Sequence, residues 1–159
     1  MIAPATTSVD VVTESATETR GLARALAAAA KRGDRIELVG PLGAGKTEFA
    51  KGFAEGLGIA EVVNSPSFTL MSEYRGRLHL FHIDLYRLQG ARDAFAAGTF
   101  DERQRDGVTL VEWADRLRPE REPEGLQVNV SIEGDVRNFA LTAPNDYTRY
   151  LEAAAPFAR

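Results

Sequence analysis

Apolar residues in the first third of the chain recur at helical spacing. Leu22 and Leu26 lie four positions apart within the alanine-rich stretch 15–31, and alanine is the strongest intrinsic helix former. Thr13 or Ser15 can cap this helix, because a side-chain oxygen at that position accepts a hydrogen bond from a free backbone N–H group. The pattern therefore predicts a helix over residues 15–31.

A short strand and a second helix follow. The run RIELV at 35–39 predicts the strand, and Phe49, Phe53 and Leu57 recur every fourth residue, as on the buried face of a helix. Gly56 lies near the end of this periodicity, where glycine commonly ends a helix. A glycine-rich segment therefore joins a strand to a helix.

Extended runs dominate the second half of the chain. Alternating apolar and polar residues with short turns between them predict paired strands, and a compact apolar run predicts a buried strand. We expect two hairpins, over 68–86 and 126–143, a buried strand over 108–113, and helical segments over 90–106 and 146–157.

The chain length of 159 residues fits a single domain. The sequence has no internal repeat, low-complexity segment or linker that would divide it. We expect residues 1–12 to form a flexible N-terminal arm and residues 13–159 to form one domain.

The composition excludes several classes of function. The sequence has no cysteine, which excludes a disulfide scaffold, a thiolate zinc site and a cysteine nucleophile. Its net charge of −4 argues against non-specific binding to nucleic acid. No apolar run approaches the ~20 residues that span a bilayer, and the N-terminus lacks the basic start and apolar centre of a signal peptide. We therefore expect a cytoplasmic protein.

The glycine-rich segment carries the clearest chemical signal. Residues 40–47, GPLGAGKT, match the pattern G-x-x-x-x-G-K-[ST]. The start of a helix presents unpaired N–H groups, and glycine lets phosphate oxygens approach the backbone closely. Lys46 can reach the β- and γ-phosphates, and the Thr47 hydroxyl can bind Mg²⁺. The segment predicts a nucleoside triphosphate site, and the absence of the guanine-reading pattern N-K-x-D favours ATP over GTP.

Two carboxylates follow predicted strands. Asp84 comes after LHLFHI and Glu112 after VTLV, and ligands gather at the carboxyl ends of strands in an open α/β sheet. Both are candidates for holding a metal or the attacking water, with a helix cap or an ion pair as the alternative. His79 and His82 lack the partners of a metal site, so we expect core packing or a hydrogen bond. We interpret Trp113 as a packing residue.

Four motifs occur in the order LVGPLGAGKTEFAKGFAEGLGI, VNSPSFTL, HIDLYRL and LVEWADRL. Together they resemble the TsaE (YjeE-type) family of bacterial P-loop ATPases, and the resemblance covers residues 13–142. It implies an α/β fold, a P-loop NTPase-like three-layer domain with a central, mostly parallel sheet extended by antiparallel strands.

The resemblance also implies a function. Members of the family bind ATP and Mg²⁺, hydrolyse ATP slowly by themselves, and act with the proteins TsaB and TsaD. That machinery installs threonylcarbamoyladenosine at adenosine 37 of ANN-decoding tRNAs, and TsaD transfers the group. The resemblance further implies that ATP turnover by the TsaE subunit resets or activates the complex, so that tRNA is reached indirectly.

The resemblance assigns site residues by position. It places the phosphate loop at Leu42, Gly43, Ala44, Gly45, Lys46 and Thr47. Glu112 corresponds to the carboxylate on the Mg²⁺ side, together with Thr47, and Asp84 to the Walker B-type acid, so Lys46, Asp84 and Glu112 form the implied catalytic set. Arg137 matches a nucleotide-contacting arginine, and Ala16 matches the N-terminal edge of the nucleotide pocket.

Three positions depart from the usual family pattern. Ser67 lies in a switch-like loop where threonine is more usual. Pro41 replaces an acidic residue, and its missing N–H group removes one possible donor to phosphate. Glu48, which we include among the nucleotide-binding residues, replaces a small hydroxyl residue, and its charge suits the helix dipole.

Two other functions fit the same loop. A small-molecule kinase on a P-loop fold would carry an arginine-rich lid, but the segment 88–107 mixes arginines with acidic residues, as a solvated surface does. A non-enzymatic module that signals by nucleotide occupancy would bind ATP without turnover.

Overall fold

The computed structural model describes residues 6–64 and 70–158. Its strands are β1 (Thr6–Thr13), β2 (Arg35–Val39), β3 (Met71–Arg75), β4 (His79–Asp84), β5 (Gly107–Glu112), β6 (Leu126–Glu133) and β7 (Val136–Pro144). Its α-helices are α1 (Ala16–Ala28), α2 (Lys46–Gly56), α3 (Ala91–Ala96) and α4 (Thr148–Ala154), and its 3₁₀ helices are η1 (Glu102–Asp106), η2 (Ala114–Leu117), η3 (Asn145–Tyr147) and η4 (Ala155–Phe157).

One seven-stranded sheet organises these elements in the order β1-β7-β6-β2-β5-β4-β3. The four central strands β6, β2, β5 and β4 run parallel to one another. Strands β7 and β1 extend the sheet on one side, and β3 on the other, all by antiparallel pairing. The predicted α/β fold with a mostly parallel centre and antiparallel extensions is confirmed.

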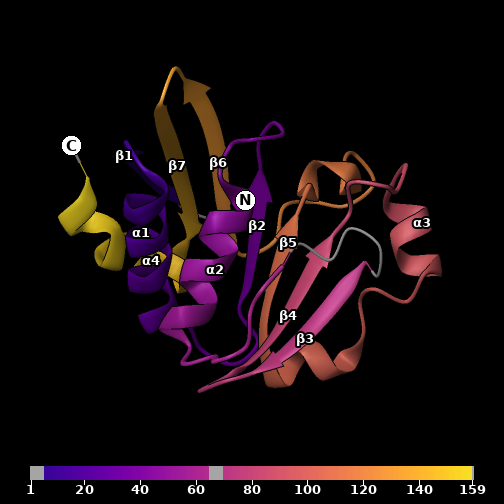
Figure 1. Cartoon of the computed structure of the whole chain (residues 1–159). Coiled ribbons are helices and arrows are strands. Elements are labelled where there is room, and N and C mark those ends of the chain that lie inside the picture. The colour runs from indigo at the N-terminus through magenta and orange to yellow at the C-terminus, as the bar shows by residue number, and fades with distance from the viewer. Residues whose placement is uncertain (1–5, 65–69, 159) are drawn as a thin grey trace.

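Helices cover both faces of the sheet. Alternate residues of the central strands belong to two different buried clusters, with Leu80 and Leu110 in the larger and Ile83 and Val111 in the smaller. Helices α1, α2 and α4 contribute to the larger cluster, whereas α3 and η2 contribute to the smaller one. Figure 1 shows α1 and α2 side by side on one face of the sheet and α3 away from them. This arrangement gives the three layers.

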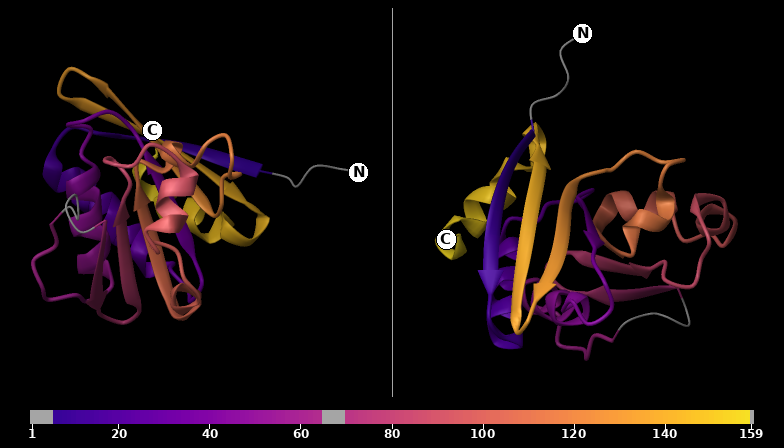
Figure 2. Two further views of the ribbon diagram at one scale, coloured as in Figure 1. Left: turned by 90° about the vertical axis from the view of Figure 1, so that its right-hand side faces the viewer. Right: turned by 90° about the horizontal axis from the view of Figure 1, so that it is seen from above.

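The prediction of a flexible arm is wrong for residues 6–12, because these residues belong to β1. Strand β1 pairs along its whole length with β7, and Val11 at its centre is fully buried. Its partner lies more than a hundred positions away in the sequence. The alternation of Val9 and Val11 with Ser8 and Asp10 is a short local signal of a half-buried strand, but it does not identify β7 as the partner. Helix α4 lies beside this edge of the sheet (Figure 2).

Two glycines let α1 and α2 approach each other closely. A Cβ atom on Gly52 would lie 2.3 Å from the carbonyl oxygen of Arg20, and one on Gly56 would lie 2.6 Å from the Cβ of Ala27. No side chain fits between the helices at these points. The glycine pair therefore fixes the distance between α1 and the second half of α2.

The C-terminal helix is tied to the turn before β2 through Asp34. Tyr150 donates a hydrogen bond from its hydroxyl to Asp34 Oδ2 at 2.5 Å, and Arg149 forms an ion pair with the same carboxylate. Tyr150 is fully buried, and burial together with its bond to Asp34 raises the pKa of its phenol well above the ordinary value. The neutral phenol is therefore part of the folded structure.

None of the helices in the described ranges has the length and the apolar run that crossing a bilayer requires.

Candidate functional site

The glycine-rich loop lies between the end of β2 and the start of α2, as the sequence predicted. Gly43 and Gly45 have φ angles of 77° and 96°, values that residues other than glycine rarely adopt. Gly40 is needed for a different reason, since a Cβ there would lie 2.9 Å from the Val130 carbonyl oxygen. Gly45 is the N-cap of α2 and offers no side chain to its first N–H groups. The loop therefore leaves backbone donors for an anion.

A cavity of about 590 Å³ opens at this loop. One wall is the loop and first turn of α2, with Leu42, Gly43, Ala44, Gly45, Lys46, Thr47 and Glu48. The facing wall follows the ends of β4 and β5, with Asp84, Tyr86, Arg87, Glu112 and Trp113. The structure thus brings the predicted phosphate loop and both predicted carboxylates to one cavity.

Lys46 is held against its own loop. Its ammonium group donates to the carbonyl oxygens of Gly40, at 2.5 Å, and Pro41, at 2.8 Å. The same nitrogen lies 4.1 Å from the ring centre of Trp113, a cation–π contact. Burial lowers the pKa of Lys46 below its ordinary value, although the nearby carboxylates, Glu112 first among them, act in the opposite direction. An arriving phosphate offers this partly desolvated cation a stronger partner.

Asp84 and Glu112 are neighbours in the sheet. They lie opposite each other in the parallel ladder between β4 and β5, and their exposed fractions are 4% and 2%. Asp84 Oδ1 accepts a hydrogen bond from the backbone N–H of Tyr86 at 2.9 Å, which fixes its orientation. Two adjacent, buried carboxylates facing a lysine suit the binding of a cation or the orientation of a water molecule.

The sequence analysis did not identify the aromatic wall of this cavity. Trp113, interpreted from the sequence as a packing residue, lines the cavity. Tyr86 lies beside it, with ring centres 4.9 Å apart and ring planes tilted by 44°. Trp113 has a φ angle of 59°, a left-handed conformation that is costly for a bulky residue and often occurs at functional sites. The available signal was position, because both aromatics follow closely after the strand-end carboxylates.

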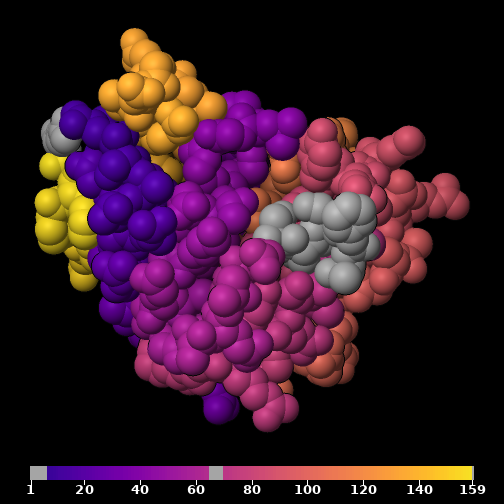
Figure 3. All heavy atoms as spheres, in the orientation of Figure 1, coloured from indigo at the N-terminus to yellow at the C-terminus, as the bar shows by residue number. Residues whose placement is uncertain are grey.

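A smaller cavity of about 190 Å³ lies on the other side of the loop. Ala16 and Arg137, both predicted to contact nucleotide, line it together with Gly43, Gly45 and Glu48, which also line the larger cavity. Arg137 comes from the β6–β7 hairpin, which projects beyond the rest of this face in Figure 3. The two cavities thus meet at the loop, as the phosphate and nucleoside ends of one ligand require.

The Glu48 side chain is neutralised by two basic side chains. Arg20, from α1, forms an ion pair with it, and Lys51 Nζ lies 3.6 Å from its other oxygen. Pro41 has no backbone N–H group to donate, but its carbonyl oxygen accepts a hydrogen bond from Lys46. Both departures from the family pattern are therefore accommodated at the loop. Ser67, predicted in a switch-like position, lies outside the described residues.

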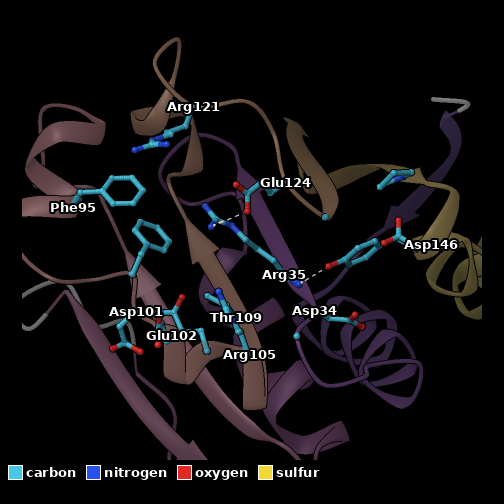
Figure 4. A pocket seen from close by; sticks show the side chains of 16 residues that line it. Asp34, Arg35, Phe95, Asp101, Glu102, Arg105, Thr109, Arg121, Glu124 and Asp146 are labelled. Carbon is cyan, nitrogen blue, oxygen red and sulfur yellow. Dashed lines mark hydrogen bonds and ion pairs between the residues drawn. The ribbon is translucent and has the colours of Figure 1, made fainter. Parts of the chain in front are cut away.

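A second large cavity, of about 640 Å³, lies at the opposite end of the strands, beside Arg35 and Thr109. Figure 4 shows Arg35 and Glu124 pointing toward each other in it, with Phe95 and Arg121 on the far side. Its charged side chains are of both signs, and it contains no phosphate-binding loop. Size alone would favour it, but the chemistry assigns the candidate site to the cavity at Lys46.

The residues present fit a nucleotide with Mg²⁺. Thr47 offers a hydroxyl, and Asp84 and Glu112 offer carboxylates, the hard oxygen ligands that Mg²⁺ prefers. Within the described part of the chain, no group of three or more acidic, histidine or cysteine side chains forms a complete metal site. This partial set agrees with a Mg²⁺ ion that is held jointly by protein and phosphate oxygens.

Comparison with known proteins gives one consistent family. The family model for "Threonylcarbamoyl adenosine biosynthesis protein TsaE" matches residues 13–139. A tRNA threonylcarbamoyladenosine biosynthesis protein TsaE from Bacillus subtilis is 45% identical over 79% of this chain and 80% of its own length. A protein of the same name from Treponema pallidum is 37% identical over 78% of this chain and 92% of its own length.

The fold has a close counterpart among solved structures. The crystal structure of Bacillus subtilis YdiB superposes with a TM-score of 0.76 at 38% sequence identity. The match covers 97% of this chain and 98% of that one.

Proposed function

This chain belongs to the TsaE family of threonylcarbamoyl adenosine biosynthesis proteins, and we propose that it serves that pathway as an ATP-binding and ATP-hydrolysing subunit. The family is a nucleotide-binding P-loop type with a role in threonylcarbamoyladenosine formation on tRNA. For this chain, we propose that it binds ATP and Mg²⁺ and that it hydrolyses ATP.

One observation carries the proposal: the cavity at Lys46. The phosphate loop and the carboxylates Asp84 and Glu112 come from segments far apart in the sequence, yet they face each other across this single space. A structural glycine turn would not require buried carboxylates opposite its lysine. Phosphoryl transfer requires this combination, because it depends on positioning and on charge stabilisation.

Each residue has a defined task in ATP hydrolysis. The backbone N–H groups of residues 43–47 and the ammonium group of Lys46 bind the phosphate oxygens. Mg²⁺, held by Thr47 and Glu112, would supply neutralisation of the phosphate charge. Glu112 also accepts a hydrogen bond from the attacking water, and Asp84 orients the polar groups beside it. Ala16 and Arg137 contact the nucleoside end.

We further propose that TsaB and TsaD are the partners and that tRNA is reached only through them. The acidic net charge supports indirect contact, since direct binding to the tRNA backbone depends on a basic surface. Family membership favours this role over the alternative of a small-molecule kinase. A role in tRNA modification also favours a cytoplasmic location for the protein.

The test combines binding, turnover and the tRNA product. Lys46→Ala should abolish Mg²⁺–ATP binding measured by calorimetry, and Glu112→Gln should keep binding but lose hydrolysis. Lys31→Ala provides a matched control, because Lys31 is exposed in the turn between α1 and β2. In a host depleted of the protein, threonylcarbamoyladenosine measured by mass spectrometry should recover with wild type and Lys31→Ala but not with Lys46→Ala. Recovery with Lys46→Ala would refute the proposal.

A further inference from the structure

A buried histidine lies directly beneath the proposed catalytic carboxylate. His82 is two residues before Asp84 on β4, and its side chain has no exposed surface. Its Nε2 lies 2.5 Å from Oε2 of Glu112 on the neighbouring strand. Core packing or a hydrogen bond was expected for His82 from the sequence, and the structure shows a hydrogen bond to the Glu112 carboxylate.

The tautomer of His82 follows from its surroundings. An ionised carboxylate only accepts hydrogen bonds, so Nε2 must carry the proton that it donates to Glu112. In residues 6–64 and 70–158, His82 Nδ1 has no hydrogen-bond partner. Placing the proton on Nδ1 would leave a buried donor unpaired and turn a lone pair of Nε2 toward the carboxylate, both of which are costly. The Nε2–H form is therefore the one that this site stabilises.

This bond is the main constraint on Glu112. Among the described residues, His82 is the one side chain that hydrogen-bonds the Glu112 carboxylate. A glutamate has three rotatable side-chain bonds, and holding one oxygen restricts the positions that the other can take. Since Oε2 is bound to His82 and Glu112 lines the cavity, Oε1 is the oxygen left for the ligand.

Packing alone does not explain a histidine at this position. His82 faces the same side of the sheet as the apolar residue Leu110, its neighbour on β5. A leucine there would bury apolar surface without the desolvation cost of an imidazole. The imidazole is therefore explained by its hydrogen bond to Glu112 and not by packing.

We propose that His82 is a positioning residue for ATP hydrolysis, which holds the Glu112 carboxylate in its working orientation through the Nε2–H bond. The inference rests on the proposed function, because it assigns Glu112 to the hydrolytic step. His82 itself is fully buried and does not line the cavity, so it acts through Glu112.

The test separates turnover from binding. Removal of groups that orient a ligand or catalytic side chain commonly costs about 10–100-fold in activity, so His82→Leu should lower kcat by that amount. The KM for ATP should stay within about threefold, because the loop and Lys46 are unchanged. His82→Gln, whose amide N–H can replace Nε2–H, should recover most of the rate. His79→Leu is the matched control, since His79 lies at the other end of β4, 3.0 Å from Glu73 and stacked on Phe81.

A double-mutant comparison distinguishes positioning from a general structural role. In the Glu112→Gln background, His82→Leu should lower kcat little further, because the group it positions is already gone. If Glu112→Gln loses turnover while His82→Leu keeps it, the inference is wrong and the proposed function stands. If the wild type does not hydrolyse ATP, or Glu112→Gln hydrolyses it normally, the proposed function fails and the inference falls with it.

A spectroscopic measurement on the wild type does not depend on how the His82 variants fold. The sequence has two histidines, so ¹H–¹⁵N spectra of wild type and His79→Leu assign both imidazoles. His82 should show the Nε2–H form with a strongly deshielded proton. A wild-type His82 without a proton on Nε2 would overturn the inference.

Discussion

Replacing Gly52 by alanine should destabilise the protein, whereas the same replacement at Gly21 should stabilise it. Both glycines lie inside helices, where alanine is favoured over glycine by about 1 kcal/mol. The two sites differ in their space. A Cβ on Gly52 would lie 2.3, 2.6 and 2.8 Å from three backbone atoms of Arg20, whereas one on Gly21 meets only Phe157 at 3.9 Å.

The magnitude follows from the atoms involved. Backbone atoms cannot rotate away, so α1 and α2 must separate to admit a methyl group at Gly52. Overpacking of this kind costs about 1–3 kcal/mol, and three contacts below 3.0 Å favour the upper end. After subtracting the gain in helix propensity, Gly52→Ala should lose about 2 kcal/mol of unfolding free energy. Gly21→Ala should gain about 0.5–1 kcal/mol.

Urea unfolding at pH 7 measures both changes, with the m-value confirming a comparable transition. For a chain of this size, 2 kcal/mol corresponds to a loss of about 4–8 °C in Tm. Gly52→Ala should also weaken ATP binding, because Ala16 and Thr19 of α1 and the loop glycines line the same small cavity. A Gly52→Ala variant as stable as wild type, alongside a stabilised Gly21→Ala, would show that the close approach of the helices is not a constraint.

Three further predictions concern charge and hydrogen bonding. Tyr150→Phe should cost about 2 kcal/mol at pH 7 by removing the bond to Asp34. Because the folded state raises the pKa of Tyr150, its stabilising contribution is complete below pH ~10 and is lost as the pH rises further. The free energy of unfolding should therefore fall less steeply with pH above ~10 in Tyr150→Phe than in the wild type, and equal slopes would contradict this. Thr47→Ala should abolish the difference in ATP affinity measured with Mg²⁺ and with a chelator, and a difference of wild-type size would exclude Thr47 as a Mg²⁺ ligand. Arg20→Ala should lower ATP affinity a few-fold by freeing the charge of Glu48, and Glu48→Ala should restore it in calorimetry, whereas an unaltered affinity would refute this role for Arg20.

Local sequence signals predicted the elements that carry the phosphate loop. The loop pattern, the flanking strand and the periodic apolar face of α2 all lie within one short segment, so Lys46 and Thr47 could be assigned directly. Asp84 and Glu112 were predicted because they end apolar strands, and parallel pairing of β4 with β5 then brings them together.

Features that depend on long-range contacts were not predicted. Strand β1 needs β7 as its partner, and the short alternation of Val9 and Val11 with polar residues does not specify that partner. The neutralisation of Glu48 by Arg20 joins two helices across 28 positions, and the bond from His82 to Glu112 joins two strands across 30 positions. In each case the side chain is visible in the sequence, but its partner is set by the packing.

The contact between Lys46 and Trp113 gives the molecule a built-in optical reporter. The sequence contains a single tryptophan, and its indole lies 4.1 Å from the ammonium group that must turn toward the phosphates. Indole emission depends on the charges around the ring, so nucleotide arrival and departure should each change the fluorescence of the unlabelled protein. Stopped-flow mixing could then time occupancy of the loop within an assembled complex, without a dye or an engineered probe.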